Sequence, residues 1–412
     1  MNDVLVLIES NTSGTGRLFF DSAVKLGLRP VLLSADPSRY PFADLLPEVE
    51  VVDTASRDAV VSACRRLWLR GARLCGVLTS SDHYVPMAAA VAGWFGLPGN
   101  PPGAVTAARD KAAQRAILAG AGVPQPRFEQ AATADEAMVL AAGIGLPVVV
   151  KPVTGSGSHG VRLCRTGEEV ARHAGRLLTM TRNERGLPVP CRVLVEEHVT
   201  GPEYSVELLN GHVVGLTRKH LGRPPLFVEI GHDFPADLPA PVADGLSSTA
   251  SAAVRNLDLT TGPAHVELRL GPSGPRLIEV NPRLAGGWIP RLVHEAIGVD
   301  LITETVRGAA GGTPRIRPEA SGAAAIRFLL MERAGVLKGF TGLERARQVP
   351  EVTEVSLYRE LGSALCPAGD FRDRIGHVMT REAHIRRAAG AAEEAARLIR
   401  PVIDGEEEDG GR

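Results

Sequence analysis

Short apolar runs alternate with amphipathic stretches along the first hundred residues. The run Val4–Ile8 contains no polar residue, which is typical of a strand buried on both faces of a parallel sheet. A turn with glycines at Gly14 and Gly16 follows, and an amphipathic stretch comes after it. The same order repeats, so strands are expected at 4–8, 30–33 and 76–79 and helices at 18–26 and 85–95. This alternation predicts an open parallel α/β sheet of Rossmann-like organisation.

The pattern changes at about residue 100. Three prolines between 98 and 102 interrupt it and predict a boundary between lobes. One helix is expected over Asp110–Ala121, and strands dominate beyond it. Asn210-Gly211 has the composition of a hairpin turn, and Gly271–Gly274 that of a second turn. The expected strands lie at 148–150, 193–195, 204–208, 264–268 and 276–280.

The last quarter of the chain begins with a linker rich in Gly, Pro and Arg over Gly311–Gly322. A new apolar strand is expected at Ala323–Leu330, and a final helix from about Arg381 to Ile399. The acidic run Asp404–Asp409 is interpreted as a solvated terminus.

Composition and charge are those of an ordinary soluble enzyme. The chain has 412 residues, 44% of them apolar and 23% charged, and its length predicts about two to four lobes. A net charge of −1 argues against nucleic-acid binding through phosphates. No apolar run reaches the roughly 18 residues of a membrane span.

The cysteines and the N-terminus favour a reducing compartment. The five cysteines are scattered, odd in number and without C-x-x-C spacing, which argues against a disulfide framework or a structural zinc site. The first ten residues lack the basic region and apolar stretch of a signal peptide. We therefore expect a cytoplasmic protein with neither nucleic acid nor a membrane as partner.

A second glycine-rich loop, Thr154–Gly160, follows Lys151 closely. Small residues let backbone N–H groups approach phosphate oxygens, and a lysine adds a point charge beside them. The lysine precedes the loop, so the segment is not a P-loop. A plain hairpin turn is the alternative.

Two glutamates end an apolar strand at 196–197, and a turn leads from them to Glu203. When this segment is considered by itself, solvated charges at a sheet edge are the better explanation.

Glu267 and Glu279 interrupt two apolar segments that the predicted turn 271–274 joins. Strand alternation places Glu279 and Asn281 on one face. Opposite Glu267, they supply three oxygen ligands of the kind that magnesium prefers. Surface acidic residues are the alternative, but carboxylates in a half-buried sheet are costly unless a cation or a donor compensates them. The pattern favours a metal site.

These features occur in the order found in the ATP-grasp superfamily, which the chain resembles from about residue 108 to 306. The ordered motifs are Arg109-Asp110-Lys111, Val150-Lys151-Pro152 with its loop, Glu-Glu-x-Val-x-Gly-Pro-Glu, Glu267, and Glu279-Val280-Asn281-Pro282-Arg283. As an ordered set they are far more specific than any one of them. The resemblance implies two antiparallel-sheet lobes that clamp ATP between them.

The resemblance also implies a role for each matching residue. The phosphates of ATP fall to Lys111, Lys151 and the loop residues Ser156, Gly157 and Ser158. The adenine falls to Glu196 and the backbone from Glu197 to Val199, and the ribose to Glu203. Magnesium, for which Mn²⁺ is an acceptable substitute, falls to Glu267, Glu279 and Asn281.

A narrower likeness links nearly the whole chain to bacterial L-amino-acid ligases. It is carried by residues 227–235, by 283–288 and by the segment from Ala323. It implies an α/β and α+β protein: an N-terminal open parallel lobe, a two-lobed ATP-grasp module and a small C-terminal α+β lobe. The expected divisions are 1–105 (substrate side), 106–200 (nucleotide lid), 201–315 (metal-bearing lobe), 323–400 (C-terminal lobe) and 401–412 (acidic tail).

The implied reaction is activation of an amino-acid carboxylate as an acylphosphate, followed by attack of a second amino acid's amine. Positioning and charge neutralisation do most of the work in phosphoryl transfer, so no protein nucleophile is needed. The planar fork of Arg283 suits a carboxylate or an oxyanion; a structural salt bridge is its alternative. Glu229 and His232 are candidates to bind the amine, to orient the acylphosphate or to remove a proton, and a structural role is the alternative for His232. Gly287, Trp288, Asp82 and His83 are predicted to line the substrate pocket.

Several alternatives stay open at this point. A dinucleotide oxidoreductase lacks support, because Phe19 stands where a third glycine is needed and Leu33 is followed by Ser34 rather than an acidic residue. A non-catalytic ATP-binding protein, or an ATP-grasp ligase or carboxylase for a purine, carbamoyl or other non-amino-acid substrate, also fits. The substrates, the choice between an α- and a γ-glutamyl-type linkage, and a homodimeric state are undetermined.

Overall fold

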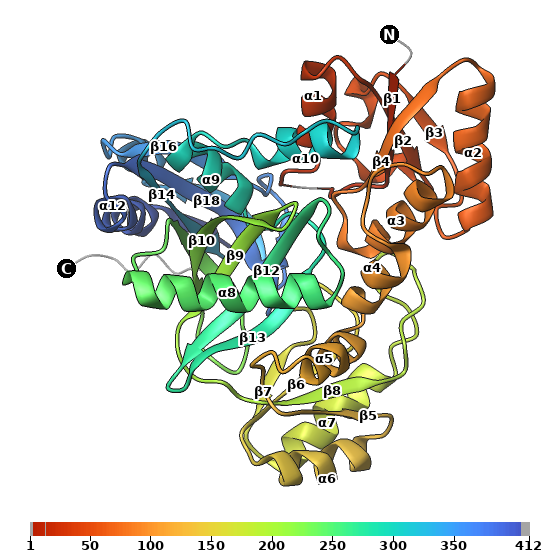
Figure 1. The fold of residues 1–412 in the computed structure, drawn as a ribbon. Helices are drawn as coiled ribbons and strands as arrows, with labels where there is room; N and C mark the ends of the chain where they lie inside the picture. Colours follow the sequence, from red (N-terminus) through yellow and green to blue (C-terminus); the bar gives the residue numbers. More distant parts are fainter. Residues whose placement is uncertain (1–2, 13, 405–412) are drawn as a thin grey trace.

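The computed structural model describes residues 3–12 and 14–404, and Figure 1 shows their arrangement. The N-terminal lobe is a four-stranded parallel sheet in the order β3-β2-β1-β4, as predicted. Side chains of Val4–Ile8 are fully buried because helices cover both faces. The elements are β1 (Asp3–Ile8), α1 (Leu18–Lys25), β2 (Arg29–Ser34), β3 (Val49–Val51), α2 (Arg57–Leu69), β4 (Arg73–Leu78) and α3 (Val85–Trp94).

A smaller lobe follows, shown at the bottom of Figure 1. Its antiparallel sheet has the order β5-β8-β6-β7, and α6 and α7 pack on one face of it. In the pairing of β6 with β8, Val149 lies opposite Glu196 and Lys151 opposite Leu194, which places Lys151 and Glu196 on one face. The elements are α4 (Pro102–Arg109), α5 (Lys111–Gly120), β5 (Phe128–Ala131), α6 (Ala134–Ile144), β6 (Val148–Pro152), β7 (Arg162–Cys164), α7 (Gly167–Leu178) and β8 (Val193–Glu197).

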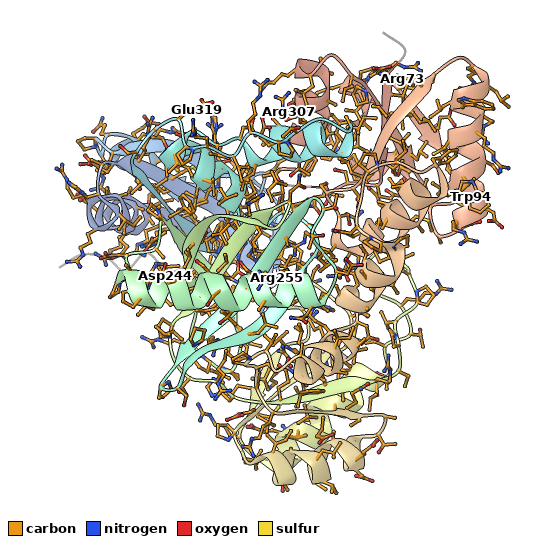
Figure 2. All side chains as sticks on the ribbon, viewed as in Figure 1. Arg73, Trp94, Asp244, Arg255, Arg307 and Glu319 are labelled. Atoms are coloured by element: carbon orange, nitrogen blue, oxygen red, sulfur yellow. The ribbon has the colours of Figure 1, made fainter. Side chains whose placement is uncertain are left out.

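An eight-stranded sheet forms the centre, in the order β13-β12-β9-β10-β11-β14-β18-β16. Helix α8 covers one face with its apolar side, while Asp244 and Arg255 project from its outer side (Figure 2). Both predicted turns are confirmed. The first strands and helices are β9 (Glu203–Leu209), β10 (His212–Leu221), β11 (Glu229–Phe234), α8 (Ala240–Asn256), β12 (Pro263–Gly271), β13 (Gly274–Asn281), α9 (Ile289–Ile297) and α10 (Leu301–Ala309).

The C-terminal segment continues this central sheet, because β14 pairs with β11 and β18 with β14. The division expected at 315–323 therefore falls in a connection between two strands of one sheet. The elements are β14 (Ala323–Leu330), β15 (Gly335–Thr341), α11 (Leu343–Arg347), β16 (Val352–Leu357), β17 (Ala364–Leu365), β18 (Arg374–Glu382), α12 (Ile385–Leu398) and β19 (Arg400–Ile403).

The start predicted for the last helix was wrong. Arg381 and Glu382 belong to β18, where they pair with Ala324 and Ala323, and the helix begins at Ile385. These two residues also fit the helical pattern, but they pair with β14 as part of a strand. Of the predicted acidic run, all but Asp404 lies outside the described residues. In the described part of the chain, no helix has both the length and the apolarity needed to cross a bilayer.

Candidate active site

One cavity of about 1020 Å³ lies where the three lobes meet. Its lining comes from the carboxyl ends of the N-terminal strands, the small-lobe loop 154–160, the central sheet and the C-terminal segment. All but one of the predicted site residues line it. These are Asp82, His83, Lys111, Lys151, Ser156, Gly157, Ser158, Glu196, Glu197, Val199, Glu203, Glu229, Glu267, Glu279, Asn281, Arg283, Gly287 and Trp288.

Two buried lysines form the wall on the small-lobe side. Nζ of Lys111 donates to the carbonyl of Gly155 at 3.0 Å and lies 3.0 Å from Oε1 of Glu279. Nζ of Lys151 lies 2.6 Å from Oε2 of Glu196. Lys111 opens helix α5, where Asp110 caps the backbone N–H groups of the first turn. The two cations are therefore held by secondary structure in one wall.

Glu196 is a buried carboxylate with both oxygens occupied. Nε of Arg115 donates to Oε1 at 2.6 Å, and Lys151 contacts Oε2. Burial opposes ionisation, but Arg115 and Lys151 hold the pKa of Glu196 below its ordinary value. Burial lowers the pKa of Lys151, against the attraction of Glu196. The Glu196 side chain is therefore placed to orient Lys151.

The side chain of Glu197 points away from Glu196 and accepts from the backbone N–H of Arg127 at 3.2 Å. The carbonyl of Val199 accepts from Arg269 at 2.9 Å, and Nε of Arg269 donates to Oε2 of Glu203 at 2.9 Å. The segment from Glu197 to Val199 is thus held by the backbone of Arg127 and by the side chain of Arg269 on β12.

The loop 154–160 bends over the cavity. Ser158 has φ 62° and Gly157 φ 61°, in the left-handed region. A Cβ on Gly157 would lie 2.4 Å from Cδ1 of Phe371, so this close approach requires glycine. Oγ of Ser158 donates to the carbonyl of Phe227 at 3.0 Å. The small-lobe loop therefore contacts Phe227, just before β11 of the central sheet, and Phe371 of the C-terminal segment.

Glu267 and Glu279 face each other directly across β12 and β13, and Asn281 pairs with His265. The predicted register is confirmed. Like charges in such positions repel. Two lysines compensate them: Lys111 contacts Glu279, and Nζ of Lys219 lies 2.9 Å from Oε1 of Glu267.

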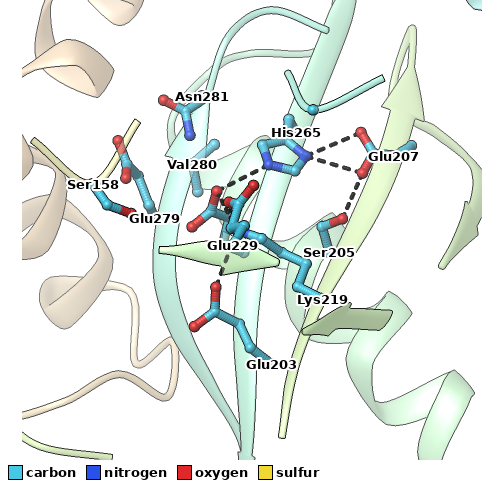
Figure 3. Close-up of polar contacts among 12 residues, drawn as sticks. Ser158, Glu203, Ser205, Glu207, Lys219, Glu229, His265, Glu279, Val280 and Asn281 are labelled. Atoms are coloured by element: carbon cyan, nitrogen blue, oxygen red, sulfur yellow. Dashed lines mark hydrogen bonds and ion pairs between the residues drawn. The ribbon is translucent and has the colours of Figure 1, made fainter. Parts of the chain in front are cut away.

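Lys219 is the centre of a buried carboxylate cluster (Figure 3). Its Nζ lies 3.0 Å from Glu203, 2.8 Å from Glu229 and 2.9 Å from Glu267. Burial disfavours the ammonium, but the three carboxylates raise the pKa of Lys219 well above its ordinary value. Lys219 is therefore a fixed positive charge beside the predicted metal ligands.

The donor set of Glu267, Glu279 and Asn281 fits a divalent cation. Two opposed carboxylates and an amide oxygen are hard oxygen ligands, and a cation between the strands relieves their repulsion. In the described part of the chain, no three or more His, Cys, Asp or Glu side chains gather as a metal site. Lysines neutralise the two glutamates in this arrangement.

His265 connects two carboxylates on the same face. Its Nδ1 lies 2.9 Å from Oε1 of Glu207, and its Nε2 lies 3.0 Å from Oε1 of Glu267. Burial alone lowers the pKa of His265, but Glu207 and Glu267 raise it to about 9. The ring is therefore a cation at neutral pH.

Arg283 reaches the N-terminal lobe. Its NH2 nitrogen donates to Oδ2 of Asp82 at 2.6 Å, and NH1 donates to the carbonyl of Leu284 at 2.8 Å. NH1 of Arg109 donates to Oδ1 of Asp82 at 3.0 Å and to Oδ1 of Asn281 at 3.2 Å. Burial disfavours the ionised carboxylate of Asp82, yet Arg283 and Arg109 hold the pKa of Asp82 well below its usual range.

His232 is the one predicted site residue that does not line the cavity. It is fully buried behind the wall, where Nδ1 lies 3.0 Å from the carbonyl of Gly287 and Nε2 lies 3.1 Å from Oε2 of Glu229. NH2 of Arg374 donates to the same Glu229 oxygen at 2.8 Å. In this position His232 can act on a bound substrate only through Glu229.

Two further predicted pocket residues, Trp288 and His83, contact segments that lie far from them in the sequence. Nε1 of Trp288 donates to Oη of Tyr358 at 2.8 Å, and Tyr358 contacts Nδ1 of His377 at 2.5 Å. Nε2 of His83 lies 2.9 Å from Oε1 of Glu184, in the loop between α7 and β8. Trp288 thus contacts the C-terminal segment, and His83 joins the N-terminal lobe to the small lobe.

Sequence reasoning missed several residues of the site. His265 had a signal, because it precedes Glu267 by two positions and shares its face of the strand. Arg115 lies one helical turn after Lys111, which also is a local signal. Arg109 stands in the motif Arg109-Asp110-Lys111 but was given no role. No local pattern marks Lys219, Glu207 or Arg374, which enter through tertiary contacts.

Comparison with known proteins agrees with this geometry. Residues 144–291 match the model of the ATP-grasp domain, and residues 327–404 match the model described as L-amino acid ligase C-terminal domain 2. An uncharacterised protein of Sinorhizobium fredii, y4rH, is 39% identical over 380 residues, covering 92% of this chain and 78% of the relative. The chain belongs to the ATP-grasp superfamily and is a carboxylate–amine ligase of the amide-forming kind.

Within that superfamily the chain is similar to L-amino acid ligases and to carnosine synthases. Carnosine synthase 1 of Gallus gallus is 29% identical over 371 residues, covering 83% of this chain. The chain spans 40% of that relative's length. The L-amino acid ligase from Bacillus licheniformis superposes with a TM-score of 0.82 at 24% identity, covering 98% of this chain and 99% of the other, which shows a common fold.

Proposed function

We propose that this protein uses ATP and Mg²⁺ to join the carboxylate of one amino acid to the amine of a second, giving a dipeptide, ADP and phosphate. The observation that carries the proposal is the meeting of two groups of residues in one cavity. Lys111 and Lys151 come to the cavity from α5 and β6, and Glu229 and Arg283 come from β11 and from the end of β13. Groups suited to phosphates thus share one cavity with groups suited to a carboxylate and an amine.

Nucleotide binding falls to the small lobe and the central sheet. Lys111, Lys151 and the backbone of Ser156–Ser158 bind phosphates. Because both oxygens of Glu196 are occupied, the adenine is bound by the backbone from Glu196 to Val199. Glu203 orients the ribose hydroxyls. The residues that would hold Mg²⁺, or Mn²⁺ in its place, are Glu267, Glu279 and Asn281, and the ion would neutralise phosphate charge.

The chemistry proceeds in two displacements. A carboxylate oxygen of the first amino acid attacks the γ-phosphorus, and the bond to ADP breaks. The amine nitrogen of the second amino acid then attacks the acyl carbon, the carbon–oxygen bond to phosphate breaks, and the nitrogen loses a proton. Arg283 holds the reacting carboxylate and stabilises the developing oxyanion.

The amine side is assigned to Glu229. Its carboxylate, which Lys219, His232 and Arg374 contact, orients the amine, while His232 fixes Glu229 from behind the wall. Gly287 and Trp288 bound the side-chain pocket, and Asp82 and His83 close it from the N-terminal lobe. Trp288 also excludes water, which would hydrolyse an acylphosphate.

The amino-acid substrates are supported by the C-terminal domain match and by the similarity to carnosine synthase. Two classes of linkage are accommodated, through the α-carboxylate or through the side-chain carboxylate of glutamate. A homodimer is compatible with this proposal.

The test is ADP release in the presence of Mg-ATP across a matrix of paired amino acids, with mass detection of the product. We expect ADP, phosphate and a dipeptide in stoichiometric amounts for at least one pair. AMP and pyrophosphate as products would contradict the acylphosphate route. ATP binding without ADP release over the whole matrix would instead favour a non-catalytic binding protein.

A further inference from the structure

A line of three buried polar residues and one half-buried glutamate crosses two neighbouring strands of the central sheet (Figure 3). In the pairing of β9 with β12, His265 lies opposite Glu207 and Glu267 lies opposite Ser205. Oγ of Ser205 donates to Oε1 of Glu207 at 2.7 Å. The two oxygens of Glu207 lie 2.9 and 3.1 Å from Nδ1 of His265, whose Nε2 lies 3.0 Å from Glu267. The chain of contacts ends on a predicted metal ligand.

The imidazole of His265 has no rotational freedom in this arrangement. Each ring nitrogen lies within hydrogen-bonding distance of a carboxylate oxygen, so the ring is held from both sides. Glu207 and Ser205, both buried, hold the far side of the ring. The buried carboxylate of Glu207 costs desolvation energy, and an apolar pair at these positions would stabilise the sheet at least as well. Stability alone is a poor account of this arrangement.

The geometry at Glu267 shows what the arrangement does. His265 and Lys219 both contact the same oxygen, Oε1, at 3.0 and 2.9 Å. A carboxylate held on one oxygen by two fixed donors has a defined torsion, and its second oxygen points in a defined direction. Across the strand pair stands Glu279.

We propose that His265, itself held by Glu207 and Ser205, is a positioning residue that fixes Glu267 for coordination of the divalent cation. The inference rests on the proposed function, because it takes Glu267 and Glu279 as metal ligands. His265 acts through Glu267. Partners of this kind typically change metal affinity by about 10–100-fold when they are removed.

The test measures metal binding without turnover. Mn²⁺ is titrated into the full-length protein with saturating ADP and followed by electron paramagnetic resonance, for the wild type, Glu207→Gln and His265→Gln. We expect the Mn²⁺ dissociation constant to rise about 10-fold in both variants. ADP affinity measured in EDTA is expected to stay unchanged, because no phosphate contact is removed.

The matched control is His220→Gln. His220 is a part-buried histidine of the same sheet whose Nε2 lies 2.7 Å from Oδ2 of Asp233. The substitution therefore removes a similar histidine–carboxylate contact that does not involve Glu267. Its Mn²⁺ affinity is expected to equal that of the wild type. Ser205→Ala removes one hydrogen bond at the far end and is expected to give a smaller loss, about threefold.

Folded Glu207→Gln and Ser205→Ala proteins that bind Mn²⁺ as tightly as the wild type would overturn the positioning role. This holds also if His265→Gln fails to fold. An equal loss in His220→Gln would overturn it as well, because the effect would then be general. A wild-type protein that binds no Mn²⁺ in the presence of ADP would contradict the proposed function itself.

Discussion

Asp82 and Arg283 are 201 positions apart in the chain and form a buried ion pair at 2.6 Å across two lobes. Asp82 begins a short 3-10 helix, Asp82–Tyr84, that follows β4, and Arg283 follows strand β13. The pair places the guanidinium against the cavity and ties the N-terminal lobe to the central sheet. A substitution that breaks this pair is therefore expected to affect both the proposed site and the stability of the protein.

Asp82→Asn is expected to lower stability at pH 7 by about 3 kcal/mol, because Arg283 and Arg109 are left buried without a countercharge. The folded-state pKa of Asp82 is depressed, so its contribution is present above its unfolded value of about 3.8 and is lost as pH falls below it. Urea unfolding at pH 7 and pH 3.5 measures this. A gap between variant and wild type that widens toward low pH would contradict the assignment.

Arg283→Ala is expected to lower turnover about 100-fold or more while the affinity for ATP changes little, because the guanidinium faces the carboxylate side of the cavity. Steady-state kinetics and ATP binding by calorimetry separate the two effects. Arg307→Ala is a suitable control, since Arg307 pairs with Glu304 within α10 and does not line the cavity. Equal losses of turnover and ATP affinity would count against the role of Arg283.

Glu279→Gln is expected to abolish magnesium-dependent turnover with the fold retained. The amide keeps the shape of the side chain opposite Glu267 but removes a charge that a divalent cation needs. Activity is measured over a range of Mg²⁺ concentrations, with thermal unfolding to check the fold. Near-normal turnover at any of them would refute the ligand assignment.

Arg115→Ala is expected to lower the free energy of unfolding by about 3 kcal/mol and to weaken ATP binding. It removes one of two cations on the buried carboxylate of Glu196, which then holds Lys151 less firmly. Denaturant titration and calorimetry measure the two effects. Arg127→Ala, which removes an exposed pair with Glu197, serves as the control. It should change neither the free energy of unfolding nor the affinity for ATP by much.

Gly157→Ala is expected to lower turnover because its Cβ would collide with Phe371 and its φ of 61° strains alanine by about 1 kcal/mol. Adding Phe371→Ala removes the collision but not the strain, so the double variant should regain part of the turnover. A double variant no better than Gly157→Ala would show that the contact with Phe371 is not what limits closure of the loop.

Local pattern was enough to predict the turn at 271–274 and the two strands that it joins. The turn aligns Leu268 with Leu277, and a shift of register between Glu267 and Leu268 then brings Glu267 opposite Glu279. The same reasoning was insufficient at Arg381 and Glu382, where pairing with β14 extends a strand into the predicted helix. Periodicity reports the intrinsic preference of a segment, and a partner strand distant in sequence can override it.

The sequence by itself determined which strands and loops line the cavity, because charged residues that interrupt apolar runs and glycines beside a lysine are visible along the chain. Tertiary structure alone decided the pairing of the charges. It places Asp82 on Arg283, Lys219 among three glutamates, and His232 behind the wall. These contacts join residues of different elements, and their partners are selected by the packing of lobes, which leaves no periodic trace in the sequence.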